Sequence, residues 1–293
     1  MSVIDEHPES AGDAQVLARR PRQCVLFLTD SDSPRILRHF DRLTAESPFP
    51  TFLCFPGTID LQRDGVVLDY KSASTRFRFR GATHGLDQPR PFVPGTLDLL
   101  WLEAIKEILH RDAFEFFWIL EFDVDFSGCW SIFFNAFLDN SSDLIATHIA
   151  RRHSLSQAKW MWWKSFNPTN ELTFDHHRKL FAPLVRLSLP LVTAVGDFYD
   201  SKQSRGHHEA LLPTLCSYFG MIIEDIGGKS EFGRGMNWVG SNAQGPTFRV
   251  NRKGMPTSYF EEAPQGFDRP NVIWHPVKVA GSPVKVPPKG NEL

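Results

Sequence analysis

The sequence contains no run of roughly 18 consecutive apolar residues, so a membrane-spanning helix is not expected. Residues 1–21 also lack the apolar stretch of a secretory signal, and we interpret them as a disordered lead-in. Cysteine is scarce, with 4 residues and no C-x-x-C pair. Such isolated thiols in apolar segments predict buried, reduced cysteines and argue against a thiolate zinc site. The expected location is therefore the cytoplasm.

Several nucleotide-binding and hydrolase motifs are also missing. The chain has no G-x-x-x-x-G-K-[ST], no G-x-G-x-x-G after its first predicted strand and no G-x-S-x-G. These absences argue against a P-loop ATPase, a dinucleotide-dependent enzyme and a serine hydrolase. The formal net charge of -2 and the pI near 6.6 create no field that would attract nucleic acid, so no nucleic-acid partner is expected.

Aromatic residues are abundant, with 25 Phe and 8 Trp among 293 residues. Such side chains fill a core or form a stacking surface for flat ligands, and the composition alone does not separate these two uses. The length suits one elaborated domain, which we place at residues 22–280, followed by a loose tail at residues 281–293.

The hydrophobic pattern predicts a strand, a helix and a second strand at the start of the domain. Residues 24–29 form a short apolar run, Ser33 and Pro34 begin a helical pattern, and residues 51–55 form the next apolar run. This βαβ order implies a parallel strand pair with a right-handed crossover. The expected fold is therefore α/β, with a mostly parallel mixed sheet flanked by helices.

Further elements follow the same logic. We predict helices over residues 96–111, 130–138, 180–198 and 211–218, and strands over residues 76–80, 114–122, 143–147 and 221–225. In the helix at residues 180–198, Pro183 and Pro190 argue for a break or a delayed start. The WMWW segment at residues 160–163 has no clean period and is expected in a loop or at a strand edge. Beyond residue 227 the composition predicts an irregular region that covers the sheet, with a last apolar segment at residues 271–275.

An acidic turn follows the aromatic strand at residues 114–122. Asp123 and Asp125 are spaced i and i+2, so their carboxylates lie on one side if the strand continues. Mg²⁺ and Mn²⁺ take oxygen ligands and keep coordination positions for phosphate or water. Ligands of open α/β sheets bind at the carboxyl ends of the strands, where this pair lies. The alternative is a simple acidic strand end, and Glu121 could face either way.

In the order of its elements and in its Asp123-Val124-Asp125 motif, the chain resembles a GT-A glycosyltransferase. The resemblance extends over residues 22–278 and names no subfamily. It implies a Rossmann-like GT-A domain in which a D-x-D motif binds Mn²⁺ or Mg²⁺, and the metal holds the diphosphate of a nucleotide-sugar donor. The acceptor would be the hydroxyl group of a carbohydrate or of another molecule.

The same resemblance implies two further site residues. Glu209 lies at the start of a predicted helix, as does the general base of enzymes of this family that invert the anomeric centre. The helix dipole is expected to keep this carboxylate ionised, and the alternative is an ordinary N-terminal Glu. Asp197 and Asp200 compete with Glu209 for the role of base. His275 matches a late histidine that serves as a third metal ligand, or else it lies at the surface beside Pro276.

The remaining candidates concern substrate binding. Asp30 and Asp32 follow the first strand, where the family contacts the base and ribose, and Lys278 would neutralise phosphate charge. The acceptor side would include three aromatic residues: Trp162, Trp163 and His208. The tryptophans would otherwise fill the core or form an edge for peripheral membrane contact.

Three functions follow from these residues. The first is a metal-dependent glycosyltransferase, with inversion at the anomeric centre if Glu209 is the base. The second is a metal-dependent phosphohydrolase or nucleotidyltransferase, for which Glu224 and Asp225 form the only other adjacent acidic pair after a strand. The third is a non-catalytic carbohydrate-binding protein that shares the fold.

Overall fold

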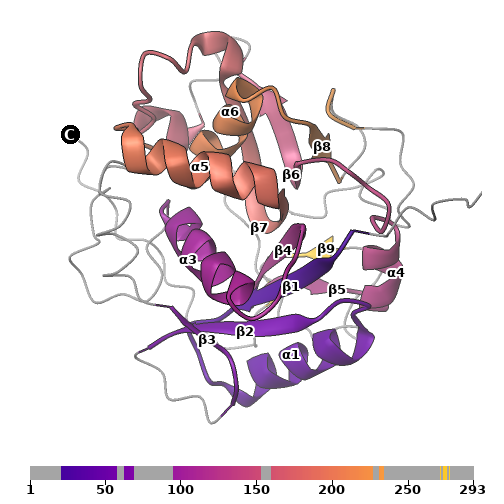
Figure 1. Cartoon of the computed structure of the whole chain (residues 1–293). Coiled ribbons are helices and arrows are strands. Elements are labelled where there is room, and N and C mark those ends of the chain that lie inside the picture. The colour runs from indigo at the N-terminus through magenta and orange to yellow at the C-terminus, as the bar shows by residue number, and fades with distance from the viewer. Residues whose placement is uncertain are drawn as a thin grey trace, which may run out of the picture.

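The computed structural model describes residues 21–57, 63–68, 95–152, 160–226, 231–233, 271, 273–275 and 277. Within these residues, seven strands form one sheet in the order β3-β2-β1-β4-β7-β6-β8 (Figure 1). Their bounds are β1 Gln23–Leu28, β2 Thr51–Pro56, β3 Val66–Leu68, β4 Phe116–Glu121, β6 Leu144–Arg151, β7 Arg178–Ser188 and β8 Ile223–Asp225. A separate two-stranded sheet pairs β5 (Asp125–Phe126) with β9 (Ile273–Trp274).

The strand directions confirm the predicted fold class. β3, β2, β1 and β4 are mutually parallel, β7 is antiparallel to both β4 and β6, and β8 is parallel to β6. The sheet is therefore mixed and mostly parallel, with β7 as its one reversed strand. The carboxyl ends of β1 and β4 and the start of β7 consequently lie at the same edge, which agrees with the Rossmann-like GT-A arrangement expected from the sequence.

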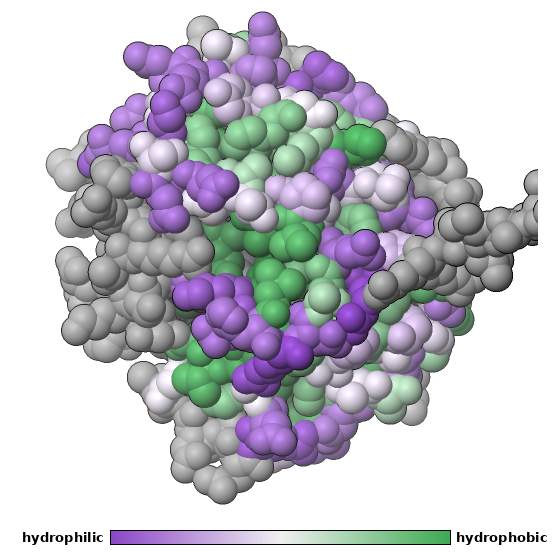
Figure 2. Space-filling view, in the orientation of Figure 1, coloured by the Kyte–Doolittle hydropathy of each residue, from purple (hydrophilic) through white to green (hydrophobic). Residues whose placement is uncertain are grey.

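Helices cover both faces of the sheet, and strand alternation decides which residue meets which helix. Val25 and Phe27 of β1 pack with α1 (Pro34–Glu46) and α4 (Trp130–Asn135). Leu26 and Leu28 pack with α3 (Leu97–Leu109), α5 (Leu189–Ser201) and α6 (His208–Tyr218). Because β1 is buried on both faces, its sequence is a continuous apolar run. In Figure 2, apolar residues gather in a band across the middle of the face shown.

Much of the aromatic content fills the core beside α4. The Trp118 ring contacts the rings of Phe133, Phe134 and Phe137 at centroid distances of 5.3 to 5.4 Å, and all four side chains are buried. Edge-to-face and tilted ring pairs of this kind stabilise a core beyond the area that they bury. For this cluster, the structure favours core filling over a stacking surface.

The helix predicted over residues 180–198 is wrong in its first half. β7 extends to Ser188, and α5 begins only at Leu189, where the Ser188 side chain accepts a hydrogen bond from the Leu191 N–H and Pro190 occupies the first turn. Pro183 is tolerated inside β7 because the pairing with β4 ends at Leu184, so no β4 partner needs its missing N–H.

Other predicted boundaries also change. The WMWW segment forms the 3₁₀ helix η3 (Met161–Lys164), not a loop or strand edge, and α4 ends at Asn135. A second 3₁₀ helix, η4, covers Phe174–His176. The predicted strand at residues 76–80, the lead-in at residues 1–20, the tail and most of the region beyond residue 227 lie outside the described residues.

The cysteines follow the expectation with one exception. All four are free thiols, and Cys24, Cys54 and Cys216 are buried, whereas Cys129 is half-buried at the start of α4. Burial raises the pKa of the Cys24 and Cys216 thiols well above the usual value. In the part of the chain that the structure describes, no helix has the length and apolarity needed to cross a membrane.

Candidate functional site

A tight turn follows β4 and separates the acidic side chains. The Val124 N–H donates to the Glu121 carbonyl oxygen at 2.9 Å, so the chain reverses instead of continuing as a strand. The i, i+2 alternation on which the sequence argument depended is lost at this turn. Glu121 and Asp123 still bring their carboxylates together after the turn, whereas Asp125 lies in the short strand β5.

The strand pair β5-β9 brings a distant histidine to this turn. Asp125 pairs with Trp274 and Phe126 with Ile273, and the Val277 N–H donates to the Asp123 carbonyl oxygen at 2.8 Å. The next side chain along β9, His275, then lies with its Nε2 atom 3.4 Å from Asp123 Oδ1 and 3.9 Å from Glu121 Oε2. One ligand atom from each of these three residues lies within 4.8 Å of the others.

We call Glu121, Asp123 and His275 the carboxylate-histidine group. Two ligands at about 2.1 Å from one ion are roughly 3 Å apart when adjacent and about 4.2 Å apart when opposite, a range that contains both measured His275 distances. Asp123 and His275 are buried and Glu121 is half-buried, so few waters compete for this position. Two carboxylates and one imidazole suit Mn²⁺ better than Mg²⁺. The residues present therefore fit a divalent ion.

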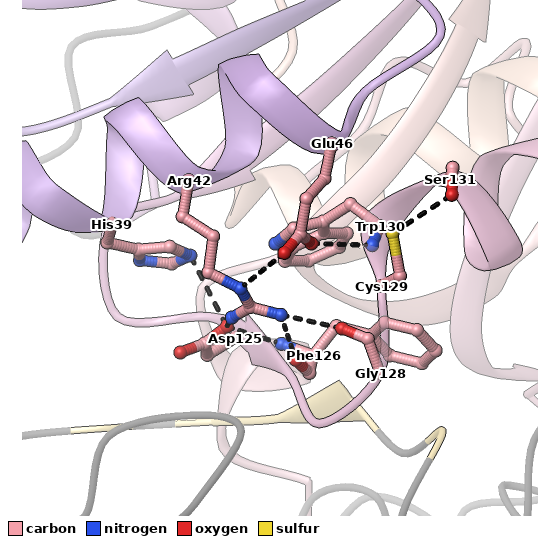
Figure 3. A network of polar contacts seen from close by, with 9 residues as sticks. All are labelled: His39, Arg42, Glu46, Asp125, Phe126, Gly128, Cys129, Trp130 and Ser131. Carbon is pink, nitrogen blue, oxygen red and sulfur yellow. Dashed lines mark hydrogen bonds and ion pairs between the residues drawn. The ribbon is translucent and has the colours of Figure 1, made fainter.

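Asp125, which the sequence places beside Asp123 on the same ion, lies elsewhere. Its Oδ1 atom accepts hydrogen bonds from Arg42 Nη1 at 2.8 Å and from the Phe126 N–H at 2.7 Å, and His39 Nε2 is 3.5 Å away (Figure 3). The Asp125 side chain thus lies against α1 and apart from Glu121, Asp123 and His275. Glu121 occupies the position expected for Asp125.

A cavity of about 100 Å³ adjoins the carboxylate-histidine group. Asp30, Leu97 and Glu121 are among its lining residues, at the carboxyl ends of β1 and β4 and the start of α3. Asp30 therefore lies where the sequence argument expects a donor contact. Asp32 is exposed at the start of α1, next to the N-cap Ser33. Lys278 lies outside the described residues.

Glu209 lies at the same edge of the sheet, in the first turn of α6. Its Oε1 atom accepts the Ala182 N–H of β7 at 3.1 Å, and its side chain is also hydrogen-bonded to Trp162. Ala182 is adjacent to Phe181, whose ring centroid is 5.3 Å from that of His275. Glu209 is thus connected to the carboxylate-histidine group through two consecutive residues of β7.

Burial raises the pKa of Glu209 to about 7, against the smaller lowering effects of its two hydrogen bonds and of Lys179. Desolvation therefore outweighs the helix dipole that was expected to keep this group ionised, because the side chain is only 9% exposed. The resulting pKa lies in the range that suits a general base near neutrality.

The three aromatic residues expected on the acceptor side differ in their burial. Trp162 is half-buried, and its ring stacks on His207 at a centroid distance of 3.9 Å. Trp163 is buried against Trp160 and Phe166 in the core. His208 is only 3% exposed and contacts the Trp101 ring, so of the three side chains Trp162 is the most accessible to a ligand.

The second acidic pair does not form a metal group. Glu224 Oε2 accepts hydrogen bonds from the side chains of Asn140 and Ser142, and Asp225 Oδ2 accepts the Ile149 N–H of β6. Both carboxylates thus fix the sheet edge at β8. Within the described residues, the carboxylate-histidine group is the one set of three or more His, Cys, Asp or Glu side chains close enough to share a metal ion.

Sequence reasoning missed the residues that hold the turn. Arg42 and His39 belong to the predicted first helix, where they resemble ordinary surface positions. Only the pairing of Arg42 with Glu46, four residues along the helix, is visible in the sequence, and such pairs are common on exposed helices. The contact of Arg42 with Asp125 depends on the tertiary packing of α1 against the turn.

No protein-family model matches the chain, and no curated protein matches it. The chain is only weakly similar to solved structures. A glycosyltransferase involved in the glycosylation of the major capsid of PBCV-1 has a TM-score of 0.31 at 10% identity, and the match covers 62% of this chain and 68% of that one. A mannosyltransferase from Pyrobaculum calidifontis, in complex with GDP-Man and Mn²⁺, has a TM-score of 0.30 at 13% identity over 61% of this chain and 48% of that one.

The bifunctional IspDF from Campylobacter jejuni also has a TM-score of 0.30, at 12% identity, with 74% of this chain and 52% of that chain covered. The match thus spans about half the length of the mannosyltransferase and of IspDF. At such TM-scores and identities, none of these likenesses assigns a substrate or an activity to this chain.

Proposed function

We propose that the protein is a metal-dependent glycosyltransferase that moves a sugar from a nucleotide-sugar donor to a hydroxyl acceptor. The observation that carries the proposal is the convergence of Glu121, Asp123 and His275 at the carboxyl edge of the sheet, beside the cavity lined by Asp30. In open α/β sheets this edge is where ligands bind.

The residues divide into a donor side and an acceptor side. On the donor side, the carboxylate-histidine group would hold a divalent ion, and Asp30 would accept hydrogen bonds from the nucleoside. A bound divalent ion supplies Lewis-acid neutralisation of the charge on the donor diphosphate. On the acceptor side, Glu209 would receive the proton of the attacking hydroxyl group, with Trp162 beside it.

With Glu209 as the base, every bond that forms or breaks in the transfer is accounted for. The acceptor oxygen forms a bond to the anomeric carbon as its proton passes to Glu209, and the bond from that carbon to the diphosphate oxygen breaks with its electron pair. A pKa of about 7 allows Glu209 to be ionised before the reaction and to hold the proton afterwards. Attack on the face opposite to the diphosphate would invert the anomeric centre.

The test measures Mn²⁺ binding and nucleotide binding by titration calorimetry. Asp123→Asn keeps the side-chain shape but weakens the metal ligand, so it should abolish Mn²⁺ binding and, with it, the Mn²⁺-dependent affinity for nucleoside diphosphates. The control is Asp41→Asn, which removes a carboxylate that pairs with Arg63 at the exposed surface of α1. Unchanged Mn²⁺ affinity in Asp123→Asn would refute the metal site.

A panel of nucleotide sugars then separates the competing functions. Mn²⁺-dependent release of a nucleoside diphosphate, faster when a hydroxyl acceptor is added, supports glycosyl transfer. Release of phosphate from a simple phosphoester without any sugar donor supports a phosphohydrolase. Sugar binding without nucleotide affinity supports a carbohydrate-binding protein.

A further inference from the structure

We infer that Arg42 is a positioning residue for the carboxylate-histidine group and that Asp125 is its anchor, not a metal ligand. The inference rests on the proposed function, because it concerns the assembly of that metal site. It gives α1 a part in assembling the metal site, which neither the Asp-x-Asp motif nor the three metal ligands themselves would indicate.

Arg42 makes three polar contacts with residues 125–128 and a fourth with Glu46 on its own helix (Figure 3). Its Nη1 atom donates to Asp125 Oδ1 at 2.8 Å, and its Nη2 atom donates to the carbonyl oxygens of Phe126 at 2.9 Å and Gly128 at 2.6 Å. Its Nε atom donates to Glu46 Oε1 at 3.1 Å. A planar guanidinium presents donors in a fixed fork, so these contacts specify the path of residues 125–128.

Glu46 extends the network to the next helix. Its Oε2 atom accepts the Trp130 N–H at 2.9 Å, at the first residue of α4. The segment between β4 and α4 is therefore fixed to α1 at Asp125, Phe126, Gly128 and Trp130. A side chain at Gly128 would collide with Asn271 Oδ1, so the far side of the segment is closely packed as well.

Asp125 is unsuited to a metal ion in this arrangement. Its Oδ1 atom already accepts hydrogen bonds from Arg42 and from the Phe126 N–H. A metal cation at this oxygen would lie beside the positive guanidinium group, and the two like charges would repel each other. The neighbouring His39 cannot substitute for Arg42, because burial lowers its pKa and favours the neutral ring.

The position of β5 determines where His275 lies. β5 supplies the pairing edge for β9, and His275 directly follows β9. The Val277 N–H also donates a hydrogen bond to the Asp123 carbonyl oxygen, which holds residues 273–277 against the turn. A displacement of β5 therefore moves His275 relative to Asp123, although Arg42 itself touches neither side chain of the pair.

The experiment compares Arg42→Lys, Asp125→Asn and the control Asp41→Asn with the wild-type chain. Mn²⁺ affinity is measured from the electron paramagnetic resonance signal of the free ion. Groups that orient metal ligands typically change metal affinity by about 10- to 100-fold when altered, so we expect losses in this range for Arg42→Lys and Asp125→Asn. Asp41→Asn should bind as the wild type does, since this carboxylate pairs with Arg63 and not with Arg42 or the turn.

Two further measurements separate positioning from a general loss of structure. The ¹⁴N coupling of the His275 imidazole to bound Mn²⁺ should weaken in Arg42→Lys and be absent in His275→Ala. Amide hydrogen exchange without metal should become faster at Phe126 and Trp274 in Arg42→Lys and stay unchanged in β1. Far-UV circular dichroism checks that each variant is folded.

The outcomes distinguish this inference from the proposed function. If Asp125→Asn abolishes Mn²⁺ binding as completely as Asp123→Asn while Arg42→Lys binds normally, Asp125 is a ligand and the inference is overturned. Unchanged ¹⁴N coupling and unchanged exchange in Arg42→Lys overturn it equally. If the wild-type chain binds no Mn²⁺, the proposed metal site fails, whereas the exchange of Phe126 and Trp274 still decides whether Arg42 positions β5 and β9.

Discussion

Glu209 should make the stability of the protein depend on pH in an unusual direction. Burial raises the pKa of its carboxyl group from the usual 4.5 to about 7 in the folded chain. Below about pH 4.5 the group is protonated in both the folded and the unfolded states. Between about pH 4.5 and 7 the folded state binds the proton and the unfolded state releases it, so stability falls as the pH rises.

The magnitude follows from the size of the pKa shift. A rise of about 2.5 units at about 1.4 kcal/mol per unit corresponds to roughly 3 kcal/mol of unfolding free energy, fully lost above about pH 7. The side chain is only 9% exposed, so solvent screening removes little of this value. Glu209→Gln cannot ionise and should not show this loss.

Urea denaturation of the wild type and of Glu209→Gln, at about pH 4.5 and about pH 8, measures the effect. The difference in unfolding free energy between the two proteins should change by about 3 kcal/mol across this range, in favour of the variant at the higher pH. Parallel pH curves would refute the reasoning, because they would mean that the Glu209 carboxyl group keeps its ordinary pKa.

Two stability predictions test the buried polar contacts away from the site. Arg186 is fully buried and donates to the carbonyl oxygens of Phe137 and Ser142, so Arg186→Met should lower the unfolding free energy by about 3 kcal/mol, measured by urea denaturation. A loss below about 1 kcal/mol would contradict this estimate. The Tyr199 hydroxyl donates to Asp98 at 2.7 Å, and Tyr199→Phe should cost about 1.5 to 3 kcal/mol in thermal unfolding, whereas an unchanged melting temperature would show that water replaces the bond.

The sequence predicted those parts of the fold that depend on local pattern. The apolar run of β1, the Ser33 cap of α1 and the periodicity of α3 all lie within two residues of their expected bounds. Residues 180–188 were misread because a strand that is buried on both faces is as continuously apolar as a buried helix. The distinction required the neighbouring strands β4 and β6, which only the tertiary structure supplies.

The candidate site was predictable only in part. The strand-end rule located Asp123, and the resemblance suggested His275, which the structure places beside it. The exchange of Asp125 for Glu121 was not predictable, because it depends on the turn at residues 121–124 and on a guanidinium contributed by α1. Whether a tryptophan is buried is equally a tertiary property, as the contrast between Trp162 and Trp163 shows.

The β5-β9 pair has a consequence for the order in which the protein can become active during its synthesis. The ribosome makes β4 and its acidic turn well before residues 273–277, which contribute both the pairing strand and the imidazole. A nascent chain could thus complete most of the large sheet while its metal site still lacked the nitrogen ligand. On the proposed function, catalysis would begin only after residues 273–277 have docked against the turn.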